Sequence, residues 1–290
     1  MTTPLLQVNE MSVTFPVMSN GLLRKQIGDH EAVKRVSFSL SPGESLGIVG
    51  ESGSGKTTLA RAILRALSTT ASSTTGSANF NSKQLGMVDL ATLDQRSLML
   101  LRTEMQMIFQ DPFSSLNPRM KVSDIVAEPL EIHQPTESAL HREKVIDILA
   151  KVGLEADCLH RFPHAFSGGQ RQRIGIARAL ILNPSLVVCD EAVSALDMSV
   201  QAQILNLLQD LQKDMGLTYL FVAHDLNVVH HFCERTLVMY QGKVVESGPV
   251  KQIFANPVHD YTRLLLSAIP SIDPDQPLSL LSRDGLNFET

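Results

Sequence analysis

The segment from Gly50 to Thr57, Gly-Glu-Ser-Gly-Ser-Gly-Lys-Thr, constrains the fold of this chain more than any other. It matches the pattern of a glycine, four residues and then Gly-Lys-Thr. The apolar run 46–49 before it predicts a short buried strand, and residues 57–66 after it favour a helix. The alternative, a glycine-rich turn that contains a lysine by chance, would not require a strand before it and a helix after it. The segment therefore predicts a strand–loop–helix unit that binds the phosphates of a nucleotide.

The backbone of the loop and two polar side chains that follow its last glycine suit it to bind phosphate. Glycines allow successive backbone N–H groups to point inward at phosphate oxygens, and the following helix N-terminus adds partial positive charge. Lys56 supplies a cation toward the β and γ phosphates, and the Thr57 hydroxyl is a ligand for Mg²⁺. The predicted nucleotide-binding residues of this segment are Gly50, Glu51, Ser52, Gly53, Ser54, Gly55, Lys56, Thr57 and Thr58.

Composition restricts the compartment and the partners. The chain has 290 residues, of which 43% are hydrophobic, and no apolar run approaches the roughly 18 residues of a membrane-spanning helix. The first twenty residues show no secretory signal, and the three cysteines have no metal-binding spacing, so we expect a chain in a reducing cytoplasm. A net charge of −5 without a basic tract gives no reason to expect a nucleic-acid partner.

Apolar runs that alternate with helical periodicity predict an α/β fold. Such an order gives a mainly parallel sheet wrapped by helices. The periodicity of residues 122–132 and 139–152 indicates a helical lobe at about 111–180, inserted in a domain of residues 1–270. Residues 16–30 suggest a loop or hairpin extension, and 68–77 a surface loop. Residues 271–290 are expected to form a weakly ordered tail.

Further motifs follow the phosphate loop in a fixed order. They are Gln110 after an apolar strand, Ser167-Gly168-Gly169-Gln170, Asp190-Glu191 after another apolar strand, Ser194-Ala195-Leu196-Asp197, and His224 after a third. This order resembles the ATP-binding cassette (ABC) ATPases, over residues 5–270. Phe166 stands before the signature where leucine is more usual, a conservative departure. The resemblance implies a phosphate-loop NTPase core with N-terminal antiparallel strands and an inserted helical lobe.

The resemblance also assigns roles to single residues. Asp190 is expected to hold Mg²⁺, together with Thr57 and Gln110, and Glu191 to orient and polarise the attacking water. In isolation, an Asp-Glu pair after a strand would be interpreted as two solvated acids. Here Asp190-Glu191 occurs in a chain with an intact phosphate loop, which favours the functional interpretation. His224 resembles the switch histidine that contacts the γ-phosphate, so Glu191 and His224 are the predicted catalytic residues.

Two predicted contacts lie further from the reacting phosphate. Phe15 aligns with the aromatic residue that stacks on adenine, and a role as a core aromatic remains equally open. In the family, Ser167, Gly168, Gly169 and Gln170 lie at a helix N-terminus and meet the ATP of a second cassette. The chain contains one phosphate loop and one signature, so the resemblance implies a second ABC ATPase chain, identical or paralogous, with Asp197 at the interface.

Two stretches indicate a branch of the family. Residues 109–119 and 256–265 resemble the oligopeptide, dipeptide and nickel importer ATPases. This implies ATP hydrolysis at the cytoplasmic face of the cell membrane, beside two permease subunits and an extracytoplasmic solute-binding protein. Ala192-Val193 replaces the usual Pro-Thr, and we expect hydrolysis to be retained. The alternatives are a soluble cassette ATPase of translation or DNA repair, and a regulatory subunit without turnover.

Overall fold

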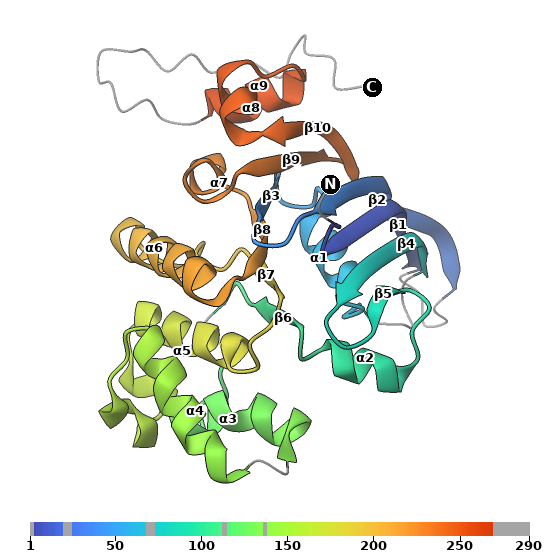
Figure 1. The fold of residues 1–290 in the computed structure, drawn as a ribbon. Helices are drawn as coiled ribbons and strands as arrows, with labels where there is room; N and C mark the ends of the chain where they lie inside the picture. The colour runs from blue at the N-terminus through green and yellow to red at the C-terminus, as the bar shows by residue number, and fades with distance from the viewer. Residues whose placement is uncertain (1–2, 20–24, 68–72, 112–114, 136–137, 269–290) are drawn as a thin grey trace, which may run out of the picture.

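The protein, described here by a computed structural model, builds its larger sheet from six strands (Figure 1). The structure describes residues 3–19, 25–67, 73–111, 115–135 and 138–268. The strand order is β10-β9-β3-β8-β7-β6. The strands are β3 (Ser45–Val49), β6 (Met105–Ile108), β7 (Leu186–Asp190), β8 (Thr218–Ala223), β9 (Arg235–Tyr240) and β10 (Lys243–Pro249). All neighbours are parallel except β9 and β10, which confirms the predicted mainly parallel sheet.

A second, four-stranded sheet is antiparallel throughout. Its order is β2-β1-β4-β5, from β1 (Leu6–Met18), β2 (Gln26–Leu40), β4 (Ser73–Ser82) and β5 (Gly86–Asp89). The hairpin alternative for residues 16–30 is confirmed where the structure describes them, because β1 and β2 pair from Leu6↔Leu40 to Met18↔Gln26. The expected surface loop at 68–77 is wrong for 73–77, which pair with β1, while 68–72 lie outside the described residues. The open edge of β1 supplies the hydrogen bonds that this Ser/Thr-rich stretch needs.

Two hydrophobic cores lie on opposite faces of the parallel sheet. Successive side chains of a strand point to opposite faces, so Leu186 and Val188 of β7 join one core and Val187 and Cys189 the other. The first core packs helix α1 (Lys56–Ile63) between the two sheets, beside α2 (Gln95–Leu101). The second is covered by α6 (Met198–Met215), α7 (Leu226–Phe232), α8 (Val250–Ala255) and α9 (Asp260–Ser267). Burial on both faces explains why these strands are almost wholly apolar.

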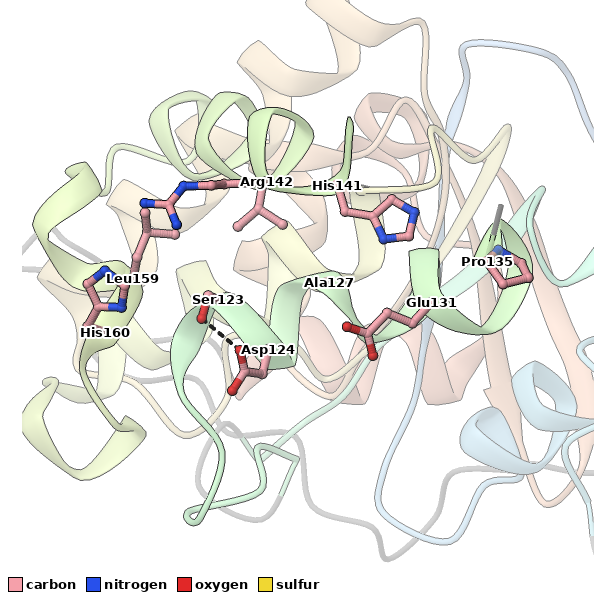
Figure 2. A pocket seen from close by; sticks show the side chains of 10 residues that line it. Ser123, Asp124, Ala127, Glu131, Pro135, His141, Arg142, Leu159 and His160 are labelled. Atoms are coloured by element: carbon pink, nitrogen blue, oxygen red, sulfur yellow. Dashed lines mark hydrogen bonds between the residues drawn. The ribbon is translucent and has the colours of Figure 1, made fainter. Parts of the chain in front are cut away.

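The chain between β6 and β7 forms the predicted helical lobe. It contains α3 (Val122–His133), α4 (Ser138–Lys151), the 3₁₀ turns η2 (Ala156–His160) and η3 (Pro163–Ala165), and α5 (Gly168–Leu180). Figure 1 places these helices together on one side of the parallel sheet. A hollow of about 410 Å³ lies between α3 and α4 (Figure 2). Ser167 lies at the N-terminus of α5, as the resemblance implies, and caps it, since its hydroxyl accepts a hydrogen bond from the Gln170 backbone N–H.

Among the residues that the structure describes, no helix is both long enough and apolar enough to cross a membrane. The predicted weakly ordered tail, residues 271–290, lies outside the described ranges.

Candidate nucleotide-binding site

The phosphate loop connects the end of β3 to the start of α1, as the sequence predicts. Gly50 and Gly55 have positive φ angles of 155° and 102°. A Cβ at Gly50 would lie 2.2 Å from the Met239 carbonyl oxygen, and one at Gly55 would lie 2.3 Å from the Ala32 carbonyl oxygen. Only glycine fits these positions, so the loop is pressed against β2 and β9 with a fixed path.

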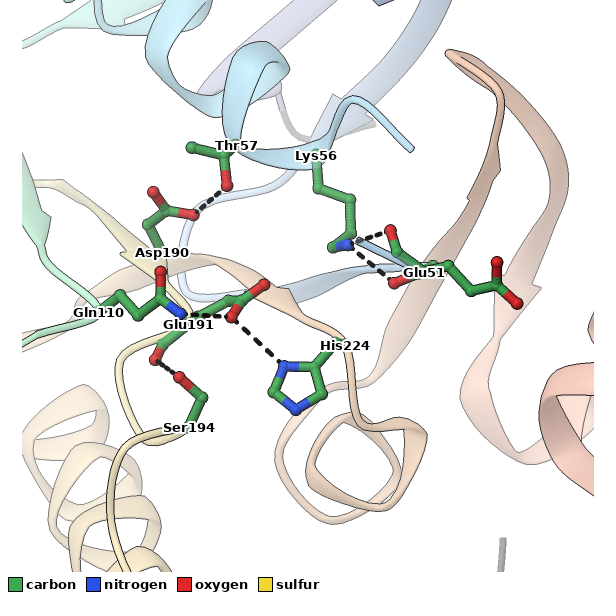
Figure 3. Close-up of polar contacts among 9 residues, drawn as sticks. Glu51, Lys56, Thr57, Gln110, Asp190, Glu191, Ser194 and His224 are labelled. Atoms are coloured by element: carbon green, nitrogen blue, oxygen red, sulfur yellow. Dashed lines mark hydrogen bonds and ion pairs between the residues drawn. The ribbon is translucent and has the colours of Figure 1, made fainter. Parts of the chain in front are cut away.

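Lys56 points its ammonium group into this loop. Its Nζ donates hydrogen bonds to the carbonyl oxygens of Gly50, at 2.7 Å, and Glu51, at 2.8 Å (Figure 3). The residue is 4% exposed, and burial lowers the pKa of Lys56 from its ordinary 10.5, against the opposing effect of nearby Glu191 and Asp190. A buried cation held at the centre of a loop of N–H groups is suited to bind phosphate oxygens.

A pair of oxygen ligands lies beside the lysine. The Thr57 hydroxyl donates a hydrogen bond to Asp190, with 2.8 Å between Oγ1 and Oδ1. Asp190 is 3% exposed, and burial raises the pKa of this carboxyl above its ordinary 3.8, against the effect of the Thr57 hydrogen bond and of Arg61. The Arg61 Nη2 atom lies 3.7 Å from Asp190 Oδ2. A hydroxyl and a carboxylate at one edge of a phosphate loop fit Mg²⁺, which prefers oxygen ligands.

Glu191 lies at the centre of a second polar group. Its Oε2 accepts a hydrogen bond from Gln110 Nε2 at 2.9 Å and lies 3.3 Å from His224 Nδ1. Gln110, Glu191 and His224 follow β6, β7 and β8, so adjacent parallel strands bring the three to one edge of the sheet (Figure 3). Glu191 has a φ angle of 51°, and Ser194 donates a hydrogen bond to its carbonyl oxygen. A left-handed backbone at a carboxylate is strain of the kind found at functional sites.

Phe15 is half-buried: its side chain packs against the core between the two sheets and also lies beside the phosphate loop. It lines, with Lys56, Glu191 and other loop residues, an open hollow of about 300 Å³. His30 lines the same hollow and is the register partner of Phe15 across β1 and β2. Both alternatives stay open, because the ring contacts the core and can also face a base whose phosphates enter the loop.

The signature segment and Asp197 lie elsewhere on the same molecule. Ser167 is exposed at the start of α5, where its backbone N–H donates to Gln170 Oε1 at 3.0 Å, and Gly168 and Gly169 form the first helical residues. Asp197 caps α6 by accepting a hydrogen bond from the Val200 backbone N–H at 3.0 Å. Neither segment lines the hollow beside Lys56. The N-terminus of α5, whose cap is uncharged, favours an anion, whereas that of α6 already carries the Asp197 carboxylate.

Three residues near the site had no predicted role. Arg61 follows Thr57 by four residues, so the two lie on the same face of α1. This spacing is visible in the sequence once residues 57–66 are predicted to be a helix. His30 depends on the β1–β2 register, which the sequence did not fix. Tyr261 of α9 accepts a hydrogen bond on its hydroxyl from the Glu51 backbone N–H at 2.8 Å and is 1% exposed. It lies in the stretch 256–265, which the sequence singled out without assigning it a role.

This fold and site define a phosphate-loop protein of the α/β NTPase class, with a helical lobe inserted between β6 and β7. The family model described as "ABC transporter" matches residues 33–194, more than half of the chain. A second model, "Oligopeptide/dipeptide transporter, C-terminal region", matches residues 245–287. The chain belongs to the ABC transporter family, which confirms the resemblance noted in the sequence.

Similar proteins agree with this assignment. The chain is 46% identical over 285 residues to the glutathione import ATP-binding protein GsiA of Escherichia coli, and 47% identical to the protein of that name from Salmonella typhi. The match covers 98% of this chain and 44% of each relative, so the chain spans less than half their length. It is also similar in structure to cbiO1 of Clostridium perfringens, with a TM-score of 0.71, 26% identity and coverage of 87% of this chain and 91% of that one. The cassette MJ0796, solved as a dimer with ADP and Pi, gives a TM-score of 0.69, 26% identity and coverage of 84% and 98%.

Proposed function

We propose that the chain is the ATP-hydrolysing subunit of a membrane importer for peptides or a related small solute such as nickel. The observation that carries the proposal is the convergence of Gln110 and His224 on one carboxylate oxygen of Glu191, beside an intact phosphate loop. A binding subunit without turnover would not need that carboxylate fixed from two sides. The glutathione import proteins among the relatives support import.

In this proposal each group at the site has one task. The loop amides and Lys56 bind the triphosphate of ATP, and Phe15 stacks on the adenine. Thr57, Asp190 and Gln110 would hold Mg²⁺, which when bound neutralises charge on the phosphates. Glu191 accepts a proton from the attacking water, an action worth about 10²- to 10⁴-fold in rate. Gln110 and His224 hold the carboxylate in place, and His224 also faces the γ-phosphate.

The exposed signature segment requires a second cassette. Ser167, Gly168 and Gly169 would bind the γ-phosphate of a nucleotide held by the partner, and Gln170 and Asp197 would lie at the same interface. Backbone N–H groups at a helix N-terminus suit that anion. The dimeric form of MJ0796 supports such an arrangement. ATP closes the two cassettes, and hydrolysis separates them.

Movement of the pair would then drive the transporter. The proposed partners are two permease subunits and, through them, an extracytoplasmic solute-binding protein, with the chain peripheral at the cytoplasmic face of the membrane. The match of residues 245–287 to the oligopeptide/dipeptide transporter region favours transport over a soluble cassette of translation or DNA repair. The net charge of −5 gives no support to a nucleic-acid partner.

The substitution Glu191→Gln tests the catalytic assignment. It keeps the shape of the side chain and removes its basicity, so ATP binding should persist while turnover falls by about 10²- to 10⁴-fold. Addition of ATP should then shift the variant to the dimer in light scattering. The matched control is Glu143→Gln, an exposed carboxylate on α4. Normal hydrolysis by the Glu191→Gln protein would refute the assignment.

A separate experiment tests import. Cells that produce the Glu191→Gln chain in place of the native one should lose uptake of labelled short peptides, glutathione or Ni²⁺, whichever the complex carries. The Glu143→Gln chain should retain that uptake. Unchanged uptake of all three solutes in the Glu191→Gln cells would reject the importer proposal while leaving ATP hydrolysis intact.

A further inference from the structure

The hollow in the helical lobe is separate from the nucleotide site. It lies between α3 and α4, with η2 at one end (Figure 2), and none of its residues lines the hollow beside Lys56. Its apolar lining comes from Ala127, Val145 and Leu159. Its volume of about 410 Å³ falls in the range of small-molecule sites. The polar groups at its two ends decide what such a molecule would be.

One end presents two acceptors, His141 and Glu131, near the Lys144 ammonium that donates to Gln134 Oε1 at 3.0 Å. His141 of α4 is 6% exposed, and its Nε2 lies 3.1 Å from the Gln134 carbonyl oxygen. A carbonyl oxygen only accepts, so Nε2 carries a proton, and with Nε2 as the single protonated nitrogen Nδ1 is an acceptor. Within the described ranges Nδ1 has no hydrogen-bond partner. Glu131 reaches into the same end from α3 (Figure 2), and no described residue pairs with its carboxylate. An ammonium group would satisfy both.

The other end presents a cation. The Arg142 guanidinium extends along α4 toward His160 of η2 (Figure 2) and forms no ion pair in the part of the chain that the structure describes. Asp124, at the start of α3, accepts a hydrogen bond from the Ser123 hydroxyl at 2.8 Å and is not paired with Arg142. Arg142 is thus available to a carboxylate, which a guanidinium binds through two parallel hydrogen bonds.

We propose that this hollow binds a small zwitterion, a free amino acid or a short peptide, with its ammonium between Glu131 and His141 and its carboxylate on Arg142. An anion alone would meet the uncompensated carboxylate of Glu131, and a cation alone would meet Arg142. A zwitterion satisfies both ends and covers the apolar lining between them. The site goes beyond the proposed function, because no group in it takes part in binding or splitting ATP.

Charge-deleted dipeptides test the proposal on the full chain without nucleotide. L-alanyl-L-alanine should bind in calorimetry with a dissociation constant of about 1 mM or tighter. N-acetyl-alanyl-alanine lacks the ammonium and alanyl-alanine amide lacks the carboxylate, so each should bind about tenfold more weakly. Equal affinity for all three peptides, or no saturable binding of any, would overturn the proposal.

Two substitutions assign the ends. Glu131→Gln should remove the preference for the free amine and keep that for the free carboxylate, and Arg142→Gln should do the reverse. Both residues are exposed on helix surfaces, so the variants should fold, and circular dichroism verifies this. Lys151→Gln, also on α4, is the matched control. If it weakened binding as much as Arg142→Gln, the effect would be general electrostatics and the site would be rejected. Because no ATP is present, the result does not depend on the hydrolysis proposal.

Discussion

Gly47 in the middle of β3 allows helix α7 to pack against the sheet, and its replacement by alanine should be costly. A Cβ at this position would lie 2.6 Å from Val229 Cγ1, 3.2 Å from Thr236 Oγ1 and 3.3 Å from Cys233 Sγ. Ordinary contacts begin near 3.4 Å, so α7 must move by most of an ångström. Val229 is fully buried and cannot rotate into solvent.

The magnitude follows from two opposing effects. Overpacking of a core by one methyl group costs about 1–3 kcal/mol, and the smaller entropy of the unfolded alanine chain returns about 0.4–1 kcal/mol. We expect Gly47→Ala to lower the free energy of unfolding by about 1–2 kcal/mol. Val229→Ala alone should cost about 1–3 kcal/mol for two lost methyl groups. In the double variant the new Cβ occupies the vacated space, so the losses should fall short of additivity by about 1 kcal/mol.

Urea unfolding of the native chain, both single variants and the double variant measures this coupling. Gly47→Ala should also weaken ATP binding, because β3 leads into the phosphate loop and α7 begins two residues after His224, and Val229→Ala should restore it. Gly175→Ala is the control, since a Cβ there meets nothing within 4 Å in the interior of α5. It should leave stability unchanged or raise it by about 0.5–1 kcal/mol. If the losses of stability in the two single variants sum to the loss in the double variant within about 0.5 kcal/mol, the packing argument is refuted.

Three further predictions concern residues of the nucleotide site. Burial places the pKa of Lys56 below 10.5, so the lysine should lose its charge, and ATP affinity should fall, as pH rises through that pKa. Fluorescence titration of ATP from about pH 7 to about pH 10 measures this fall, and Lys56→Arg, which stays charged, should not show it. Tyr261→Phe removes the hydroxyl that accepts a hydrogen bond from the Glu51 N–H and should lower the free energy of unfolding by about 1–3 kcal/mol in urea, whereas the half-buried Tyr240→Phe should cost less. Phe15→Ala should weaken ATP binding by about 1–3 kcal/mol in the same titration, with stability little changed; the reverse pattern would establish a core role.

The parts of the fold that could be predicted are short segments whose own residues determine their local structure, without a distant partner. Strand β7 was predictable because burial on both faces excludes polar side chains along it. The start of α5 was predictable because Ser167 satisfies an N–H of its own first turn. The hairpin of β9 and β10 was predictable because Gln241 and Gly242, with φ angles of 47° and 85°, suit the two-residue turn.

The rest depended on partners that a local pattern does not identify. Residues 73–77 became a strand because β1 offered them an unpaired edge, and Ser and Thr tolerate the exposed face. Tyr261 contacts Glu51 across 210 positions of sequence, and no periodicity or spacing predicts that pair. The ion pair of Arg61 with Asp190 likewise exists only after β3 and β7 take their places in one sheet.

The contact between Gln110 and Glu191 links the chemistry to the inserted lobe. Gln110 lies at the point where the chain leaves β6 for the lobe, and Glu191 lies where the next strand in the sheet, β7, ends after the chain returns from it. Their hydrogen bond of 2.9 Å therefore joins the connection by which the chain leaves for the lobe to the carboxyl end of β7, a strand of the sheet. His224, which follows β8 of the same sheet, has its Nδ1 atom 3.3 Å from the same Glu191 oxygen. We therefore expect a displacement of the lobe that moves Gln110 to change the position of the proposed catalytic carboxylate.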